Sequence, residues 1–376
     1  MGVARFCRMA LRLWWGVILV LALSCHFYSP SRRRLVHSRL LAIYSWLIMA
    51  ANLVLFYAYY ICSSTYFADG TFEQEQQQFM DQIFYTNIVI QFVSLIVQIL
   101  MRVLREREVC QAYNEVSEIL EQELNHQEPS RFYCRAFLIK IHNFVNNFNF
   151  VLSILLIWGT RSFELADIFS NLYFVYNSLT RDAAQMAYIL LLLDLSEALR
   201  LNGQRKQRSY GQLMEQLRRQ ERLLGIGRRV HRMFAWLVAI TLFFQLYYNT
   251  STIYLGYAII IEGQGALGMP IYSMKVLFTA LSFLVILGDG LLLQIVCEHL
   301  MAEENEVCTS PRLRRRDEDA KAAHRQWELS VLRRAIRSAS PENEVLGMFT
   351  MDMQCAFALI SSSLANGIII IQMGYV

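Results

Sequence analysis

Seven long apolar stretches dominate the pattern of hydrophobic and polar positions along this chain of 376 residues. They lie at 40–62, 83–104, 136–158, 168–195, 233–261, 272–297 and 346–373. A helix needs about 20 predominantly apolar residues to cross the hydrocarbon core of a bilayer, and each stretch meets that requirement. The pattern therefore predicts an all-α polytopic membrane protein with seven transmembrane helices.

A shorter apolar run precedes these stretches at 9–27. Arg5, Arg8 and Arg12 crowd its start and three arginines follow at 32–34, so the run is marginal as a membrane span. It lacks a cleavage site of small residues, which disfavours a removed signal peptide. We interpret the run as an N-terminal helix that lies in the cytoplasmic interface, and an additional span stays the alternative.

The charges between the apolar stretches predict the orientation of the chain. The connections at 63–81 and 262–271 contain neither lysine nor arginine, whereas those at 102–135, 199–232 and 299–345 are rich in arginine. Basic loops stay on the cytoplasmic side of a membrane. We therefore expect an inverted topology, with the N-terminus in the cytoplasm and the C-terminus outside, which is the reverse of a G-protein-coupled receptor.

Composition and motifs argue against most other classes of function. The net charge of +4 comes from the basic connections, so we expect no nucleic-acid partner. The 8 cysteines are scattered without a CxxC pair, so we expect no metal site. The chain carries no phosphate-binding loop, dinucleotide fingerprint, metalloprotease motif or nucleophile elbow. We therefore expect no cofactor, no catalytic residue and no enzymatic activity.

Two of the basic connections keep a helical period. Apolar residues recur at helical spacing in 212–231 and in 319–337. These helices would pack together or against a neighbouring subunit as a cytoplasmic bundle, or else lie on the bilayer surface. The predicted division is a cytoplasmic N-terminus with the interfacial helix (1–38), six transmembrane helices (39–298), a cytoplasmic linker with an anchor helix (299–345) and the last transmembrane helix (346–376).

Charged residues inside the spans are candidates for function, because burying them in a membrane is costly. Arg181 and Asp182 interrupt the fourth span, and Asp289 interrupts the sixth. Both spans run from outside to inside, and Arg181 and Asp289 reach a comparable depth from the outer ends. We expect these two residues to form a buried ion pair or to line a water-filled ligand cavity.

Aromatic and polar residues gather toward the expected outer side. Trp158 and Tyr176 lie on the third and fourth spans, Tyr247 and Tyr248 lie on the fifth, and Lys275 begins the sixth. A tyrosine offers an apolar ring and a hydroxyl group, which suits a pocket for small organic molecules. The alternatives are an ordinary interfacial aromatic belt and, for Lys275, an anchor that reaches to the interface.

The last span carries a polar residue in its final turn, Gln372. An unpaired amide in hydrocarbon costs several kcal/mol, so this side chain must face protein or water. Gln372 is therefore expected on an interface or in a pore.

The topology and the last span together resemble the insect gustatory receptor family, part of the seven-helix superfamily of insect chemoreceptors. The signature of that family is Thr-Tyr, five mostly apolar residues and then Gln-Phe. Here Ala365 and Asn366 stand in place of Thr-Tyr, residues 367–371 fill the five apolar positions, Gln372 matches, and Met373 replaces Phe.

The resemblance implies a tetrameric, ligand-gated, non-selective cation channel in which the last helix of each subunit lines a central pore. It assigns Gln372 as the pore-lining amide, Ile369 as the gate position and Met373 as a residue that narrows the pore. Asn366 would add a polar pore residue or an inter-helix hydrogen bond. A ring of four isoleucines can block ions by excluding water.

The implied partners are a small-molecule tastant, the lipid bilayer and other gustatory receptors in a homo- or hetero-tetramer. Bitter or aversive compounds are the commonest tastants of the family, whose members reside in the plasma membrane of gustatory neuron dendrites. The first alternative is a non-conducting, modulatory subunit of a heteromeric taste receptor. A G-protein-coupled receptor would need the opposite loop charges, and a transporter would be expected to show internal repeats.

Overall fold

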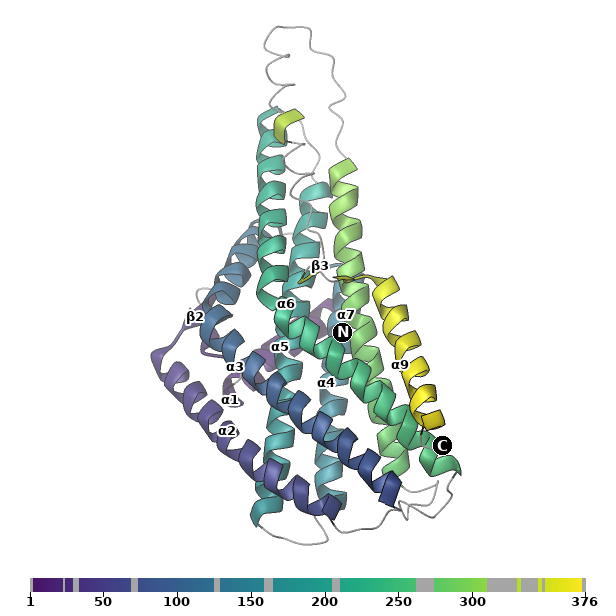
Figure 1. Ribbon diagram of the computed structural model, residues 1–376. Helices are drawn as coiled ribbons and strands as arrows, with labels where there is room; N and C mark the ends of the chain where they lie inside the picture. The colour runs from purple at the N-terminus through teal and green to yellow at the C-terminus, as the bar shows by residue number, and fades with distance from the viewer. Residues whose placement is uncertain are drawn as a thin grey trace.

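The computed structural model describes residues 3–22, 24–29, 34–68, 74–124, 129–158, 165–204, 210–261, 274–309, 330–332, 344–346 and 349–373. Within these residues the expected spans coincide, apart from their ends, with seven long helices (Figure 1). These helices are α2 (Arg39–Ala68), α3 (Gln74–Leu124), α4 (Arg131–Trp158), α5 (Leu165–Gln204), α6 (Tyr210–Ile261), α7 (Met274–Thr309) and α9 (Met353–Met373).

The apolar run near the N-terminus forms a helix that ends earlier than its hydropathy predicts. Helix α1 covers Val3–Val20, and a hairpin of strands β1 (His26–Ser29) and β2 (Arg34–His37) follows. Ala22 lies between them with a left-handed φ of 53°. A non-glycine residue rarely adopts that conformation, and here Ser45 and Arg102 donate hydrogen bonds to its carbonyl oxygen at 3.2 Å and 3.0 Å.

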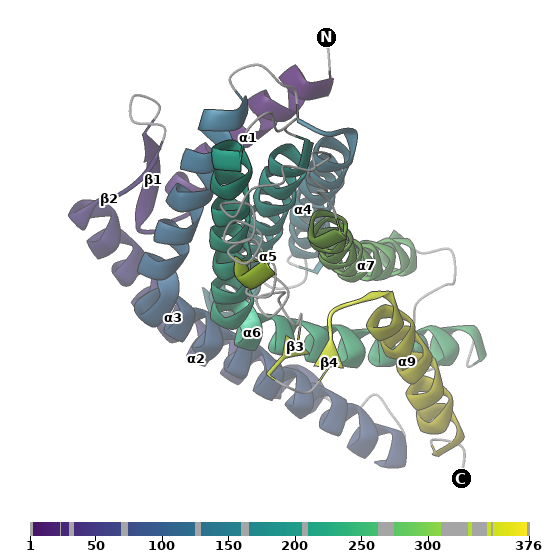
Figure 2. The ribbon, with the colours of Figure 1, turned by 90° about the horizontal axis from the view of Figure 1, so that it is seen from above.

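Helix α1 lies across the flank of the bundle rather than along it (Figure 2). One stripe of the helix is buried, at Cys7, Ala10, Trp14 and Ile18. Large apolar side chains on its other faces are exposed, among them Leu13. The placement of α1 in the membrane interface stays a prediction.

The long helices pack tightly at one end of the molecule and spread apart at the other (Figure 1). Helix α5 is central and contacts α2, α3, α4, α6 and α7. The buried core is concentrated where its second half meets the first half of α6, with Leu192, Leu199, Leu223 and Leu224 at 0 % exposure. Residues 212–231 lie within α6, as their helical period predicts. Most of the second expected inner helix, 319–337, lies outside the described residues.

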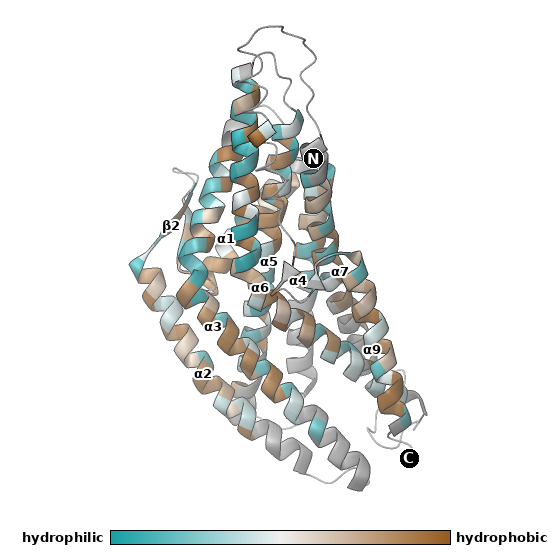
Figure 3. Ribbon diagram, turned by 45° about the horizontal axis from the view of Figure 1, so that its top comes forward, coloured by the Kyte–Doolittle hydropathy of each residue, from teal (hydrophilic) through white to brown (hydrophobic). Residues whose placement is uncertain are grey.

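Exposed apolar residues cover the spread end of the bundle. Figure 3 shows hydrophobic residues along the coloured part of α2, in the middle of α3 and on α9, and hydrophilic residues on the upper parts of α3 and α6. Four helices of the described part are long and apolar enough to span a membrane, at Arg39–Ile61, Tyr85–Leu120, Gly211–Ser251 and Met353–Gln372. Membrane crossing by α4, α5 and α7 stays a prediction, as does the inverted topology.

The last helix begins later than its hydropathy indicates. The expected span starts at residue 346, but Leu346 has a left-handed φ of 55° between the short strands β3 (Glu344–Val345) and β4 (Phe349–Thr350). Asp352 then caps α9, because its Oδ1 atom accepts a hydrogen bond from the backbone N–H of Cys355 at 2.8 Å. The helix therefore starts at Met353.

Candidate pore face and ligand cavity

Helix α9 is held at the edge of the bundle by one narrow stripe of small residues. It contacts α6 and α7 (Figure 2). Ala356, Ser363 and Gly367 are buried on that side. A Cβ atom at Gly367 would lie 2.8 Å from the Cγ2 atom of Ile253, so glycine permits the closest approach of α9 and α6.

The expected pore residues lie on the exposed part of the α9 surface. Asn366, Ile369 and Gln372 are three residues apart and follow one another along one face of the helix, and all three are exposed. Half of the Ile369 surface is accessible, at 50 %. The side chain of Met373 lies outside the described residues. One subunit thus presents the apolar gate position between two amides on a surface that no part of its described chain covers.

The charged residue of the sixth span is largely shielded and paired, but not with the expected partner. Lys140 Nζ of α4 donates to Asp289 Oδ2 of α7, and Asn143 Nδ2 donates to Asp289 Oδ1 at 2.8 Å. The Lys140 side chain is 0 % exposed and that of Asp289 is 13 % exposed. The expected ion pair between Arg181 and Asp289 is therefore corrected to one between Lys140 and Asp289.

Arg181 lies near this pair but is held by an aromatic ring. Its guanidinium carbon lies 3.8 Å from the centre of the Phe244 ring, a cation–π contact. Its Nη1 atom is buried and has no hydrogen-bond partner within the described part of the chain. A buried cation with an unsatisfied donor is costly, so this atom offers a strong binding interaction to an acceptor that enters the site.

A small cavity joins the three expected charged residues. Arg181, Asp182 and Asp289 line it together with Gln185, Gln245 and Gly290. The cavity measures about 30 Å³. That volume holds one or two waters, which need roughly 10–15 Å³ of such space each, and is too small for a tastant. The three charged residues thus share one cavity, and a ligand the size of a tastant would have to widen it.

Gly290 shapes the wall of this cavity. A Cβ atom at that position would lie 2.0 Å from Nε2 of Gln245, because the Gln245 amide lies directly against the glycine backbone. Any larger residue would force the Gln245 side chain to move. The two glycines that flank Asp289 in the sequence are therefore not equivalent, since the nearest described atom to a Cβ at Gly288 is Asn143 Nδ2, at 4.0 Å.

The expected aromatic residues are only partly near this site. Tyr248 stacks on Phe244 with ring centres 6.0 Å apart, and so extends the Arg181 contact. Tyr247 is half-buried one residue before it. Tyr176 has another contact, because its hydroxyl donates to the carbonyl oxygen of Leu21 at the end of α1, at 3.1 Å. The side chains of Trp158 and Lys275 lie outside the described residues.

Sequence reasoning missed Lys140, Asn143 and Gln245. Lys140 and Asn143 lie one helical turn apart inside the third expected span, and a lysine with an amide at that spacing was the available signal. Gln245 lies two residues before Tyr247 and carries no pattern of its own. The partner of Asp289 is 149 positions away along the chain, which no local period reveals.

Comparison with known proteins places these features in context. The model of the family described as 7tm Chemosensory receptor matches residues 11–376. The Drosophila melanogaster protein named Putative gustatory receptor 10b is 56% identical over 379 residues, with 100% of both chains covered.

Two solved structures share the fold. The insect olfactory receptor OR5 from Machilis hrabei aligns with a TM-score of 0.63 at 14% identity, covering 97% of this chain and 99% of that chain. The same receptor in complex with eugenol aligns with a TM-score of 0.57 at 13% identity, with the same coverage.

Proposed function

We propose that this chain, which belongs to the 7tm chemosensory receptor family, is a gustatory receptor that acts as a ligand-gated, non-selective cation channel. The family is one of chemosensory receptors and not of enzymes. In this proposal four subunits surround a pore, and a small-molecule tastant opens it. In the proposed inverted topology, α9 crosses the plasma membrane along the pore, and its C-terminal end with Gln372 lies at the extracellular mouth.

The exposed face of α9 is the observation that carries the proposal. Two unpaired amides would be costly on a helix face that contacts lipid. Yet Asn366 and Gln372 flank Ile369 on a surface that the rest of the described subunit leaves uncovered. Around a four-fold axis the four Ile369 side chains form an apolar constriction, and the amides replace part of an ion's hydration shell once the helices separate.

The cavity lined by Arg181, Asp182 and Asp289 is the proposed tastant site. It combines fixed charges of both signs with the ring of Phe244 and an unsatisfied Arg181 donor. Tyr248 extends its aromatic wall. Helices α6 and α7 border this cavity and also contact α9, so widening the cavity for a ligand would shift the supports of the pore helix. Bitter or aversive compounds are the proposed ligand class.

A matched pair of substitutions on α9 tests the gate. Ile369→Ala is compared with Leu364→Ala, which is also 50 % exposed but lies about 140° around the helix. Each chain is expressed alone, surface protein is quantified, and whole-cell current is recorded without any ligand. Ile369→Ala is expected to leak cations, while Leu364→Ala stays closed like the unsubstituted chain. An Ile369→Ala channel that stays shut at equal surface abundance would refute the gate assignment.

A modulatory subunit is the second candidate function. Ala365, Asn366 and Met373 depart from the family's terminal pattern, and the departures fall on the helix that would conduct. If this candidate is correct, neither the unsubstituted chain nor Ile369→Ala carries current when expressed alone. Each then alters the current of a co-expressed gustatory receptor.

A further inference from the structure

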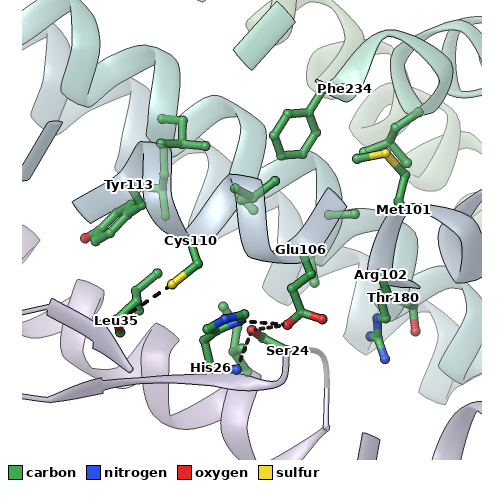
Figure 4. Close-up of a pocket in the computed structure, with 18 of the residues that line it drawn as sticks. Ser24, His26, Leu35, Met101, Arg102, Glu106, Cys110, Tyr113, Thr180 and Phe234 are labelled. Atoms are coloured by element: carbon green, nitrogen blue, oxygen red, sulfur yellow. Dashed lines mark hydrogen bonds and ion pairs between the residues drawn. The ribbon is translucent and has the colours of Figure 1, made fainter. Parts of the chain in front are cut away.

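A second cavity lies between α1 and the bundle, apart from the proposed tastant site. It measures about 130 Å³ and is bordered by α1, β1, α3, α5 and α6. Figure 4 shows its polar residues Ser24, His26 and Glu106 at one end and the apolar side chains of Met101 and Phe234 toward the other. No residue lines both this cavity and the one at Arg181 and Asp289.

Small residues on α5 leave this space open. Ala183, Ala184 and Ala187 all line the cavity, where leucines occupy the neighbouring turns of the same helix. Trp14 and Ile18 of α1 close the opposite wall. The walls are mostly apolar, and a comparable engineered cavity of about 150 Å³ binds benzene. The volume therefore suits a molecule with a single ring.

The polar end of the cavity is firmly built. Glu106 Oε1 accepts hydrogen bonds from Ser24 Oγ at 2.8 Å and from the backbone N–H of Cys25, and it pairs with His26 Nδ1 at 3.1 Å. Burial lowers the pKa of His26, but its contacts with Cys110 and Glu106 more than compensate and raise that pKa to about 9. The imidazolium and the carboxylate therefore hold one another, and the hairpin is fixed against α3.

Three other polar atoms on the cavity lining are unsatisfied. Gln98 Oε1, Arg102 Nη2 and Trp14 Nε1 are buried without a hydrogen-bond partner among the residues that the structure describes. Gln98 is 4 % exposed and Trp14 is 2 % exposed. Gln98 and Arg102 are four residues apart on α3, so they lie on one face and offer an acceptor beside a donor.

From these groups we infer that this cavity is a binding site for a small one-ring molecule that carries a hydroxyl group, such as a simple phenol. A hydroxyl donates one hydrogen bond and accepts others, so it can pair with Gln98 Oε1 as a donor or with Arg102 Nη2 as an acceptor. The ring fills the apolar space beside Ala187 and Phe234. The site is distinct from the proposed tastant cavity, because the two share no lining residue within the part of the chain that the structure describes.

Calorimetric titration of the full chain in lipid nanodiscs tests the inference, with empty nanodiscs as the reference. The probes are 4-methylphenol and toluene, which differ by the hydroxyl group. The phenol is expected to bind about tenfold or more tightly than toluene, because it pairs polar atoms that toluene leaves unsatisfied. Equal affinities, or no saturable binding of the phenol, would overturn the inference.

Substitutions locate the binding. Ala187→Leu fills the cavity and is expected to weaken binding of the phenol at least tenfold, whereas Ala51→Leu on the exposed surface of α2 leaves it unchanged. Gln98→Met is expected to abolish the preference for the phenol while toluene still binds, which keeps the test decisive if Ala187→Leu does not fold. Phenol binding that survives Ala187→Leu, or that Tyr248→Phe removes, would place the molecule elsewhere and contradict the assignment.

Discussion

Replacing Lys140 by methionine is expected to destabilise the bundle strongly. The substitution keeps the length and apolar stem of the side chain but removes the cation from a position that is 0 % exposed. Among the residues that the structure describes, Asp289 would then keep only the 2.8 Å hydrogen bond from Asn143. Removing one partner of a buried ion pair typically costs about 3–5 kcal/mol, because the remaining charge loses its direct partner.

A double-mutant cycle isolates this effect from the change in shape. Lys140→Met, Asp289→Asn and the double variant are purified, and their thermal unfolding is followed by intrinsic fluorescence. The double variant is expected to be more stable than Lys140→Met, with a coupling energy of roughly 2–3 kcal/mol. A second cycle with Arg181→Met serves as the control. If Arg181 couples to Asp289 more strongly than Lys140 does, the corrected pairing is wrong.

Three further predictions concern contacts between other elements. Gly367→Ala should lower thermal stability by about 1–2 kcal/mol, because the new methyl group would lie 2.8 Å from Ile253, and Ile253→Ala should restore most of that loss. The charged form of His26 should stabilise the protein by at most about 3 kcal/mol, fully below pH 6.5 and progressively less as the pH rises through about 9. The melting temperature should therefore fall over this pH interval, and it should fall less in His26→Gln. Tyr176→Phe should cost about 1 kcal/mol in unfolding measurements by removing a hydrogen bond to the end of α1, and more than Tyr44→Phe, whose bond to α1 is exposed. A flat pH profile, a missing Ile253 rescue, or an equal cost for both tyrosines would contradict these contacts.

Hydropathy located the long helices well, because membrane-length apolar runs leave the backbone few alternatives to helix. Hydropathy did not locate the helix ends, because individual hydrogen bonds and backbone conformations decide where a helix begins or stops. The apolar run at 9–27 continues past Val20, but the left-handed Ala22 and the donors that bind its carbonyl end α1 there. By hydropathy the last span likewise extends back to residue 346, yet the cap at Asp352 starts the helix at Met353.

The candidate site was predictable as a set of residue types but not as a set of pairs. Arg181, Asp182 and Asp289 stand out because charges are rare in apolar spans, and they do share one cavity. Depth counted along two helices could not identify the partner of Asp289, since it ignores rotation about each helix axis. Lys140 and Arg181 both reach the region, and packing of α4 against α7 selects the lysine.

The central claim is that four copies of this chain alone form a cation channel closed by Ile369. Its most direct test is current recording from planar bilayers that contain only purified Ile369→Ala protein, with different sodium and potassium concentrations on the two sides. The account predicts discrete openings without ligand and a reversal potential that indicates poor discrimination between the two cations. Silent bilayers, at a protein incorporation verified by recovery from the membrane, would contradict it.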